Sequence, residues 1–264
     1  MNLNLMTWNL FHGRDAPPAA VRASLGRRIS GRPERSGGHL QITSDLSAEF
    51  HAHLAKAEWD VCLLQECPPR WRRSLEEACG ADSFESKTSR NWLGPLTGAI
   101  ASHRPDLMAS WEGGSNLILV RGRAGGILDS TTVTLARRPE RRTLALVRLG
   151  CGAVAGCLHL STEPGRAASE ALIAAVAVTG WANGDQVVLG GDFNLRPGDG
   201  GTYETLEQMG LYGALAGSID QLLTSSALDP PAIRWEESRR EVVRDGLALR
   251  LSDHAPVSRS VLID

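Results

Sequence analysis

The sequence predicts a protein of mixed helices and strands, of the α/β or α+β class, built around β-sheets. Strand-like apolar runs recur along the whole chain of 264 residues, and amphipathic helical patterns lie between some of them. Several of these runs follow one another directly between about 115 and 160, which a strictly alternating βα barrel would not contain. The pattern therefore favours neighbouring strands in mixed sheets.

The individual elements follow from local patterning. A helix is expected at 45–57, where Leu46, Phe50 and Leu54 share one face, and another at 163–180, before the turn residues Asn183 and Gly184. Strands are expected at 3–8, 61–65, 116–121, 127–134, 143–149, 153–160, 186–189, 219–224 and 257–263.

The stretch at about 13–40 differs from the rest of the chain because it is rich in glycine, proline and arginine. Its arginines are Arg14, Arg22, Arg27, Arg28, Arg32 and Arg35. Elsewhere no Pro/Gly/Ser linker divides the chain, and no internal repeat is visible. The sequence thus predicts a single domain over 1–264 with a flexible, arginine-rich insertion at about 13–40.

Composition limits the classes of function. With a formal net charge of −2, the chain has no overall attraction for nucleic acid or anionic membranes, so a polyanion would need a local basic patch. The five cysteines form no Cys-x-x-Cys pair, which argues against a disulfide framework or a zinc site and favours the cytoplasm. No apolar run reaches the ~20 residues of a membrane-spanning helix, so no transmembrane segment is expected.

Polar residues stand where several apolar runs end. Asn9 ends the first run in TWNLFHGR, and taken alone it is most simply a turn-capping amide. Glu66 follows the apolar residues 61–64 in DVCLLQECPPR. A carboxylate at the end of a buried strand needs a partner, and a metal ion or a basic side chain are the usual ones. His12, three residues beyond Asn9, is a weaker candidate to reach a bound phosphate.

The segment GGDFN repeats this arrangement after another apolar run. If the strand continues through it, Asp192 and Asn194 lie on the same face and can act on one substrate. His159 lies within the apolar segment GCLHLST, where a histidine taken alone is most simply a core residue.

Three further polar residues belong to the C-terminal part of the chain. Asp253 and His254 precede the last apolar run in SDHAPV, and Asp220 begins an earlier one. Together with the preceding residues they form the oxygen-rich set expected around a hard cation and a phosphate.

The ordered segments LLQE, GGDFN and SDHAPV resemble the endonuclease/exonuclease/phosphatase superfamily, and the match extends from Asn9 to His254. The resemblance implies an α/β fold, a four-layer sandwich of two packed mixed β-sheets flanked by helices. It also implies an active site at one end of the sandwich.

The resemblance further implies roles for these residues. Glu66 is expected to be the main ligand of Mg²⁺, with Mn²⁺ as a substitute, and Asn9 and Asp253 to complete the site. Asp192 is expected to deprotonate the attacking water, and the nearby cation to lower its pKa. The remaining expected catalytic residues are Asn194 on a phosphate oxygen, His254 on the scissile phosphate with Asp220 behind it, and His159 on the developing negative charge.

The substrate is less determined by the sequence. The arginine-rich stretch favours an endo- or exonuclease acting on DNA, by in-line attack of water. A phosphatase or phosphodiesterase acting on a small-molecule, inositol or lipid phosphoester is the alternative, and a non-catalytic binding module on the same fold is a third. A monomer is expected.

Overall fold

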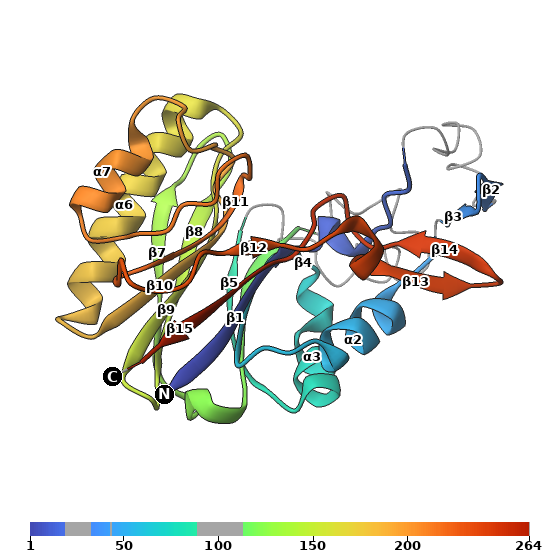
Figure 1. The fold of residues 1–264 in the computed structure, drawn as a ribbon, viewed down its shortest axis with the longest axis horizontal. Helices are drawn as coiled ribbons and strands as arrows, with labels where there is room; N and C mark the ends of the chain where they lie inside the picture. Colours follow the sequence, from blue (N-terminus) through green and yellow to red (C-terminus); the bar gives the residue numbers. More distant parts are fainter. Residues whose placement is uncertain (19–32, 43, 89–112, 264) are drawn as a thin grey trace.

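Two β-sheets packed face to face form the centre of the protein, in a computed structural model that describes residues 1–18, 33–42, 44–88 and 113–263 (Figure 1). The first sheet contains, in spatial order, β12 (Ile233–Arg234), β15 (Val257–Leu262), β1 (Asn2–Asn9), β4 (Val61–Cys67), β6 (Ser115–Val120) and β5 (Asp82–Lys87). The second contains β11 (Asp220–Thr224), β10 (Gln186–Asp192), β9 (Ala153–His159), β8 (Arg142–Leu149) and β7 (Ile127–Ala136). Both sheets are mixed, because β1 pairs in parallel with β4 and β9 in parallel with β10.

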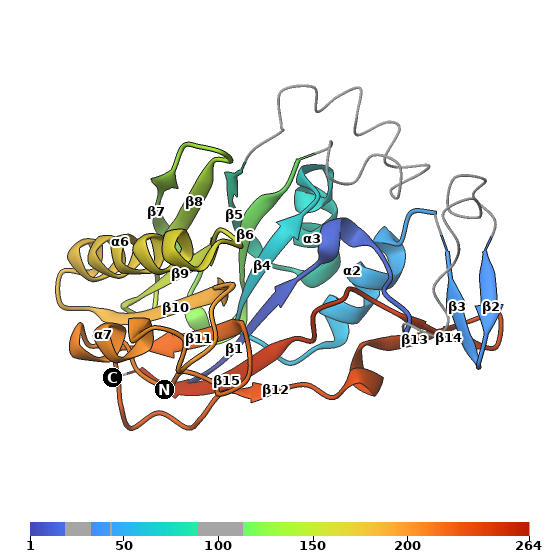
Figure 2. The same ribbon diagram turned by 90° about the horizontal axis from the view of Figure 1, so that it is seen from above.

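Helices cover the outer faces of both sheets (Figure 2). The first sheet carries α2 (Ser47–Lys56) and α3 (Arg72–Cys79), and the second carries α6 (Pro164–Ala182) and α7 (Thr202–Gln208). Short 3-10 turns lie at η1 (Phe11–Gly13), η3 (Pro69–Trp71), η4 (Gly122–Ala124) and η5 (Glu237–Arg240). The predicted four-layer α/β sandwich is confirmed.

The alternation of side chains along each strand explains why the layers form. In β1, Leu3 and Leu5 point into the core between the two sheets, whereas Met6 and Trp8 point toward α2 and α3. The same period of two recurs in β4, β8, β9 and β10, whose strands are buried on both faces. Such strands appear in the sequence as continuous apolar runs, which is why they are recognisable there.

The two sheets pack closely against each other at Gly190. A Cβ atom at this position would lie 2.6 Å from Leu222 Cδ2 and 2.7 Å from Leu63 Cδ1, which belongs to the opposite sheet. A glycine is therefore required in the middle of β10, and it fixes the separation of the sheets at this point.

The predicted elements agree with the observed ones to within a few residues, but several elements were not predicted. These are α3, α7, the polar strand β5, the two-residue strand β12, and a small third sheet with the order β13 (Glu241–Arg244), β14 (Leu247–Arg250), β3 (His39–Gln41) and β2 (Glu34–Ser36). Figure 1 shows this sheet projecting beyond α2. The last part of the expected insertion at 13–40 is thus paired as β2 and β3, whereas residues 19–32 lie outside the described residues.

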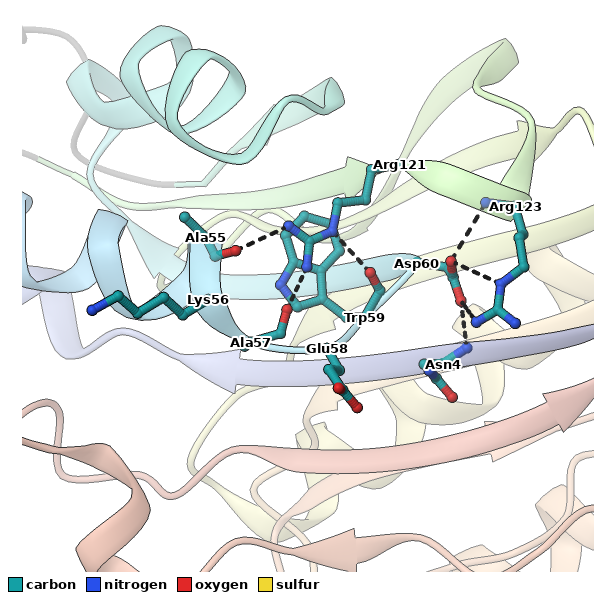
Figure 3. A pocket seen from close by; sticks show the side chains of 9 residues that line it. All are labelled: Asn4, Ala55, Lys56, Ala57, Glu58, Trp59, Asp60, Arg121 and Arg123. Carbon is teal, nitrogen blue, oxygen red and sulfur yellow. Dashed lines mark hydrogen bonds and ion pairs between the residues drawn. The ribbon is translucent and has the colours of Figure 1, made fainter.

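Two arginines, Arg121 and Arg123, lie at the end of the sandwich where β1 and β4 begin (Figure 3). The Arg121 guanidinium lies 3.8 Å above the Trp59 ring and donates to three carbonyl groups between residues 55 and 59. Beside it, Arg123 pairs with Asp60 at 3.1 Å. These charges are satisfied within the protein, so the hollow that they line is best explained as structural.

None of the helices in the described part of the chain has both the length and the apolar character that a membrane crossing requires.

Candidate active site

Polar side chains gather at the end of the sandwich where β1, β9 and β10 end and β11 begins. The alternation that points Leu5 into the core also turns Asn9 inward, and the same parity applies to the other three strands. The inward-facing polar residues, with their exposed fractions, are Asn9 (2%), Asp192 (2%), Asp220 (4%) and His159 (8%). The apolar core between the sheets therefore ends in a buried polar layer.

Glu66 joins this layer because β4 is irregular at its end. In a regular strand Glu66 would follow Cys62 and Leu64 onto the outer face. A bulge shifts the pairing between Leu64 and Cys67, and Cys67 occupies the outer face instead. Glu66 takes a left-handed φ of 49°, a conformation that costs a non-glycine residue about 1–3 kcal/mol and is typical of functional sites.

Asn9 connects the carboxylates that the two sheets contribute. Its Nδ2 donates to Glu66 Oε1 at 3.4 Å and to Asp192 Oδ2 at 3.0 Å. Its Oδ1 accepts the backbone N–H of Phe11 at 2.9 Å. Burial pushes the pKa of Glu66 upward, but His12, His159 and the Asn9 amide outweigh it and lower the pKa overall. Glu66 is therefore ionised at neutral pH.

Asp192 is the most deeply buried carboxylate of the site. Its Oδ1 accepts the backbone N–H of Asn194 at 3.0 Å, and across the strand pair β10–β11 it lies directly opposite Asp220. Burial, followed by the charge of Asp220, raises the pKa of Asp192 to about 7. The protein groups alone thus raise this pKa, because two acids share a site with little water, and the lowering expected from a bound cation stays a prediction.

Asn194 does not share a strand face with Asp192. The strand β10 ends at Asp192, and Asn194 has a left-handed φ of 51°. Its side-chain Nδ2 donates to the Leu160 carbonyl at 2.9 Å. The assumption that the strand continues is thus incorrect, and the turn instead directs the Asn194 backbone N–H at Asp192.

His254 and Asp220 form a close pair across the site. His254 Nδ1 lies 2.9 and 3.0 Å from the two carboxylate oxygens of Asp220. Burial disfavours the charged ring, but the hydrogen bond and charge of Asp220, together with Asp192, raise the pKa of His254 to about 10. His254 is therefore an imidazolium, and its Nε2 lies 3.8 Å from Asp192 Oδ2.

The loop between β14 and β15 positions His254. Ser252 has a left-handed φ of 60°, donates its hydroxyl to the Asn9 carbonyl at 2.6 Å and accepts the His254 N–H at 3.1 Å. Trp8 Nε1 donates to the His254 carbonyl at 2.9 Å. Ser252 directly precedes Asp253 in the SDHAPV segment, but its role was not predicted from the sequence.

His159 lies between the two central carboxylates. Its Nε2 is 3.5 Å from Asp192 Oδ2, and its Nδ1 is 3.8 Å from Glu66 Oε1. Burial lowers the pKa of His159 to about 3, so the ring is neutral. A neutral ring can donate one N–H to a developing negative charge but carries no positive charge of its own.

The rim of the site carries Asp253 and Arg14. Asp253 is 38% exposed, and its Oδ1 lies 3.9 Å from His254 Nε2. Arg14 lies 3.7 Å above the Phe11 ring. Arg35 is farther away in the small sheet, where it pairs with Asp245, and the four remaining predicted arginines, Arg22, Arg27, Arg28 and Arg32, lie outside the described residues.

The donor atoms around Glu66 fit a hard divalent cation. Glu66 is ionised and partly exposed, and the Asp253 carboxylate on the rim is close enough to interact with its charge. Asp192, Asp220 and His254 also bring possible ligand atoms within 4.8 Å of one another. Because His254 is protonated between these two acids, that group is better suited to holding and moving a proton than to binding a metal.

A buried layer of carboxylates and histidines at one end of two packed sheets is a site at which the chemistry of phosphoester hydrolysis is possible. The chain belongs to the Endonuclease/Exonuclease/phosphatase family, whose model matches residues 6–254. The resemblance drawn from the sequence segments is thereby confirmed.

Solved structures of the same fold cover almost all of the chain. An endonuclease/exonuclease/phosphatase family protein from Bacteroides thetaiotaomicron is 15% identical, with a TM-score of 0.66 and coverage of 100% of this chain and 98% of that one. A mannosyl-6-phosphatase from the same species is 17% identical, with a TM-score of 0.65 over 98% and 100%. Truncated TDP2 from Caenorhabditis elegans is 14% identical, with a TM-score of 0.58 over 98% and 97%. A comparison with curated protein sequences finds no match.

Proposed function

We propose that the protein hydrolyses phosphodiester bonds with the help of a divalent metal ion, with DNA as the substrate and water as the nucleophile. The observation that carries this proposal is the convergence of Glu66, Asp192 and His254 from both sheets in one buried layer. Each of them supplies a different function that the hydrolysis of a phosphate anion requires.

Glu66 and Asp253 would hold Mg²⁺, or Mn²⁺ in its place. Asn9, whose Oδ1 accepts the Phe11 N–H, would not bind the ion directly. It orients the Glu66 carboxylate that would hold the ion. When bound, the ion neutralises charge on the phosphate oxygens and lowers the pKa of nearby carboxyl groups.

Asp192 is the proposed general base. Its two oxygens are oriented by the Asn9 amide and by the Asn194 backbone N–H, so the carboxylate cannot rotate freely. The protein groups alone place its pKa near neutrality and a bound ion would lower it, so the carboxylate is ionised and able to accept a proton from water at physiological pH.

His254 is proposed to contact the scissile phosphate as an imidazolium, with Asp220 fixing its orientation and its charge. The Nε2 of His254 lies 3.8 Å from Asp192 Oδ2, so a phosphate bound beside this pair would be within reach of both the base and this positive charge. His159 and Asn194 are proposed to add neutral hydrogen bonds to the phosphate oxygens.

DNA as the substrate is supported by the arginine-rich stretch that begins at Arg14, directly beside the site. A second candidate is a small phosphoester. It is favoured by the net charge of −2 and by ion pairs that occupy nearby arginines of the small sheet, such as Arg250 with Glu241 at 2.8 Å. The mannosyl-6-phosphatase of similar fold shows that the scaffold is used for such a substrate.

A substrate panel with Mg²⁺ or Mn²⁺ tests the proposal. Plasmid DNA, an abasic oligonucleotide, inositol phosphates, sphingomyelin and mannose 6-phosphate would be compared. Asp192→Ala and His254→Ala are each expected to lower turnover by a factor of roughly 10²–10⁴ with an unchanged circular dichroism spectrum. Asp245→Ala, which removes an exposed acid of the small sheet, is the matched control.

The outcomes separate the candidates. Cleavage of DNA that chelation abolishes supports the nuclease, and cleavage of small phosphoesters alone supports the second candidate. Unchanged rates in both site variants contradict the site assignment, and absence of both activity and metal binding favours a non-catalytic binding module.

All five cysteines are free thiols, which supports the further proposal of a reducing, cytoplasmic location.

A further inference from the structure

We propose that His12 is a direct ligand of the divalent ion at Glu66, so that the centre is a mixed nitrogen–oxygen site that selects Mn²⁺ over Mg²⁺. This inference rests on the proposed function, because it assumes an ion at Glu66. Imidazole nitrogen is a better ligand for transition metals than for Mg²⁺, which prefers oxygen.

The distance between the two side chains fits a shared ion. His12 Nε2 lies 3.1 Å from Glu66 Oε2, and the side chains are 16% and 21% exposed. Two ligands at right angles on an ion with bonds of about 2.1 Å lie about 3.0 Å apart. The two atoms are therefore separated as neighbouring ligands of one octahedral ion would be.

The backbone that carries His12 is strained. Phe11, His12 and Gly13 have successive left-handed φ values of 50°, 53° and 74°. Outside glycine this conformation costs about 1–3 kcal/mol per residue and persists only where the surroundings enforce it. Gly13 packs against the ring of Trp71, since a Cβ atom there would lie 2.3 Å from Trp71 Cη2.

A second glycine supports the pair from behind. A Cβ atom on Gly114 would lie 3.3 Å from His12 Cε1 and 3.4 Å from the Cα atom of Glu66. The main chain preceding β6 therefore contacts both residues at once. Such support limits the motion of both side chains, which is what a metal site needs from its surroundings.

The side-chain amide of Asn9 does not turn its oxygen toward the expected ion, so another residue can supply a ligand. Its Oδ1 accepts the Phe11 N–H, so its Nδ2, a donor without a lone pair, faces Glu66. Because Phe11 needs this acceptor, the orientation of the amide is fixed by the same turn that carries His12. The turn at Phe11–Gly13 therefore directs the Asn9 Oδ1 away from the expected ion and the His12 imidazole toward it.

Electron paramagnetic resonance with Mn²⁺ as the probe tests the proposal directly. The wild-type protein with bound Mn²⁺ should show hyperfine coupling to an imidazole nitrogen, detected by electron spin echo modulation. His12→Gln should lose this coupling and weaken Mn²⁺ binding about 10- to 100-fold by calorimetry, with a smaller loss for Mg²⁺. His159→Gln should keep the coupling, and His39→Gln, in the small sheet, serves as the control.

The possible results distinguish failure of this inference from failure of the proposed function. If wild-type protein binds Mn²⁺ without nitrogen coupling, His12 only hydrogen-bonds to Glu66 and the inference is wrong, while the metal site stands. Coupling that persists in His12→Gln also overturns the inference. If wild-type protein binds neither Mn²⁺ nor Mg²⁺, the proposed function itself fails. Absence of nitrogen coupling in the wild-type protein overturns the inference even if His12→Gln does not fold, and its loss in a folded His159→Gln protein would assign it to His159 and overturn the inference as well.

Discussion

Replacement of the proposed general base, Asp192→Asn, is expected to remove activity and to stabilise the metal-free protein. Burial and Asp220 raise the pKa of Asp192 from 3.8 to about 7. Each tenfold difference in proton affinity corresponds to about 1.4 kcal/mol, so the ionised carboxylate destabilises the fold by up to about 4 kcal/mol. Asparagine removes this penalty but turns an N–H group toward the Asn9 amide, and an unmade hydrogen bond costs about 1–3 kcal/mol. The expected net gain is about 1–3 kcal/mol at pH 8.

The gain has a defined dependence on pH. Because the pKa of Asp192 is raised in the folded protein, the folded state binds the proton more tightly than the unfolded chain does. The contribution of this group to wild-type stability is therefore fully present below about pH 4 and is lost as the pH rises through about 7. The advantage of the variant should shrink steadily as the pH is lowered from 8.

Urea unfolding at pH 5 and pH 8, with EDTA in both buffers, measures this effect. Turnover, measured with metal, should fall by a factor of about 10²–10⁴. Asp245→Asn is the matched control, because Asp245 is an exposed acid with a left-handed φ of 51°, which asparagine tolerates. Equal differences between variant and wild type at the two pH values, or a variant less stable at pH 8, would refute the reasoning.

Three other predictions follow from the geometry. Asp220→Asn should lower kcat by about 10²–10⁴ with little change in KM, because His254 loses the carboxylate that holds its ring, and steady-state kinetics would show the split. Gly191→Ala should cost more than about 3 kcal/mol in urea unfolding, since its φ is 144° and a Cβ atom would lie 1.9 Å from a carbonyl oxygen of β9. Gly180→Ala in α6, where a Cβ atom meets nothing within 4 Å, should instead gain about 0.5–1 kcal/mol, and a loss there would contradict the comparison. Burial lowers the pKa of His53, with Arg239 and Lys56 adding to it, so His53→Phe should gain stability relative to wild type as the pH drops through about 6.5; an equal difference between the two proteins at pH 8 and pH 5.5 would exclude this group.

The sequence predicts the strands that are buried on both faces, together with β7, β15, α2 and α6, but not the short polar elements. Runs such as Val187–Leu189 are recognisable because every residue is apolar, whereas β5, with the sequence DSFESK, lies at a sheet edge and has no such signal. The third sheet is also polar, and it joins segments about 200 positions apart, at His39 and Ala248. Pairing over such a distance leaves no local pattern in the chain.

Residue types at the site are predictable from the sequence, but their environments are not. The motifs identify Glu66, Asp192 and His254, and the structure brings these side chains together. The raised pKa of Asp192 depends on Asp220 lying opposite it, a register that only the folded sheet defines. The left-handed turn at Asn194 and the bulge at Glu66 are likewise set by tertiary contacts, so the face on which each side chain lies could not be derived.

The close packing of the two sheets at Gly190 determines how activity responds to mutations far from the site. Asn9 and Glu66 are attached to one sheet and His159, Asp192 and Asp220 to the other, so their mutual distances are set by how the sheets are seated against each other. A substitution that enlarges or shortens a side chain in the core between the two sheets, far from any reacting group, would shift one sheet relative to the other. The two sets of site residues would then move apart by fractions of an ångström. Such a change would disable the chemistry while the molecule was still fully folded.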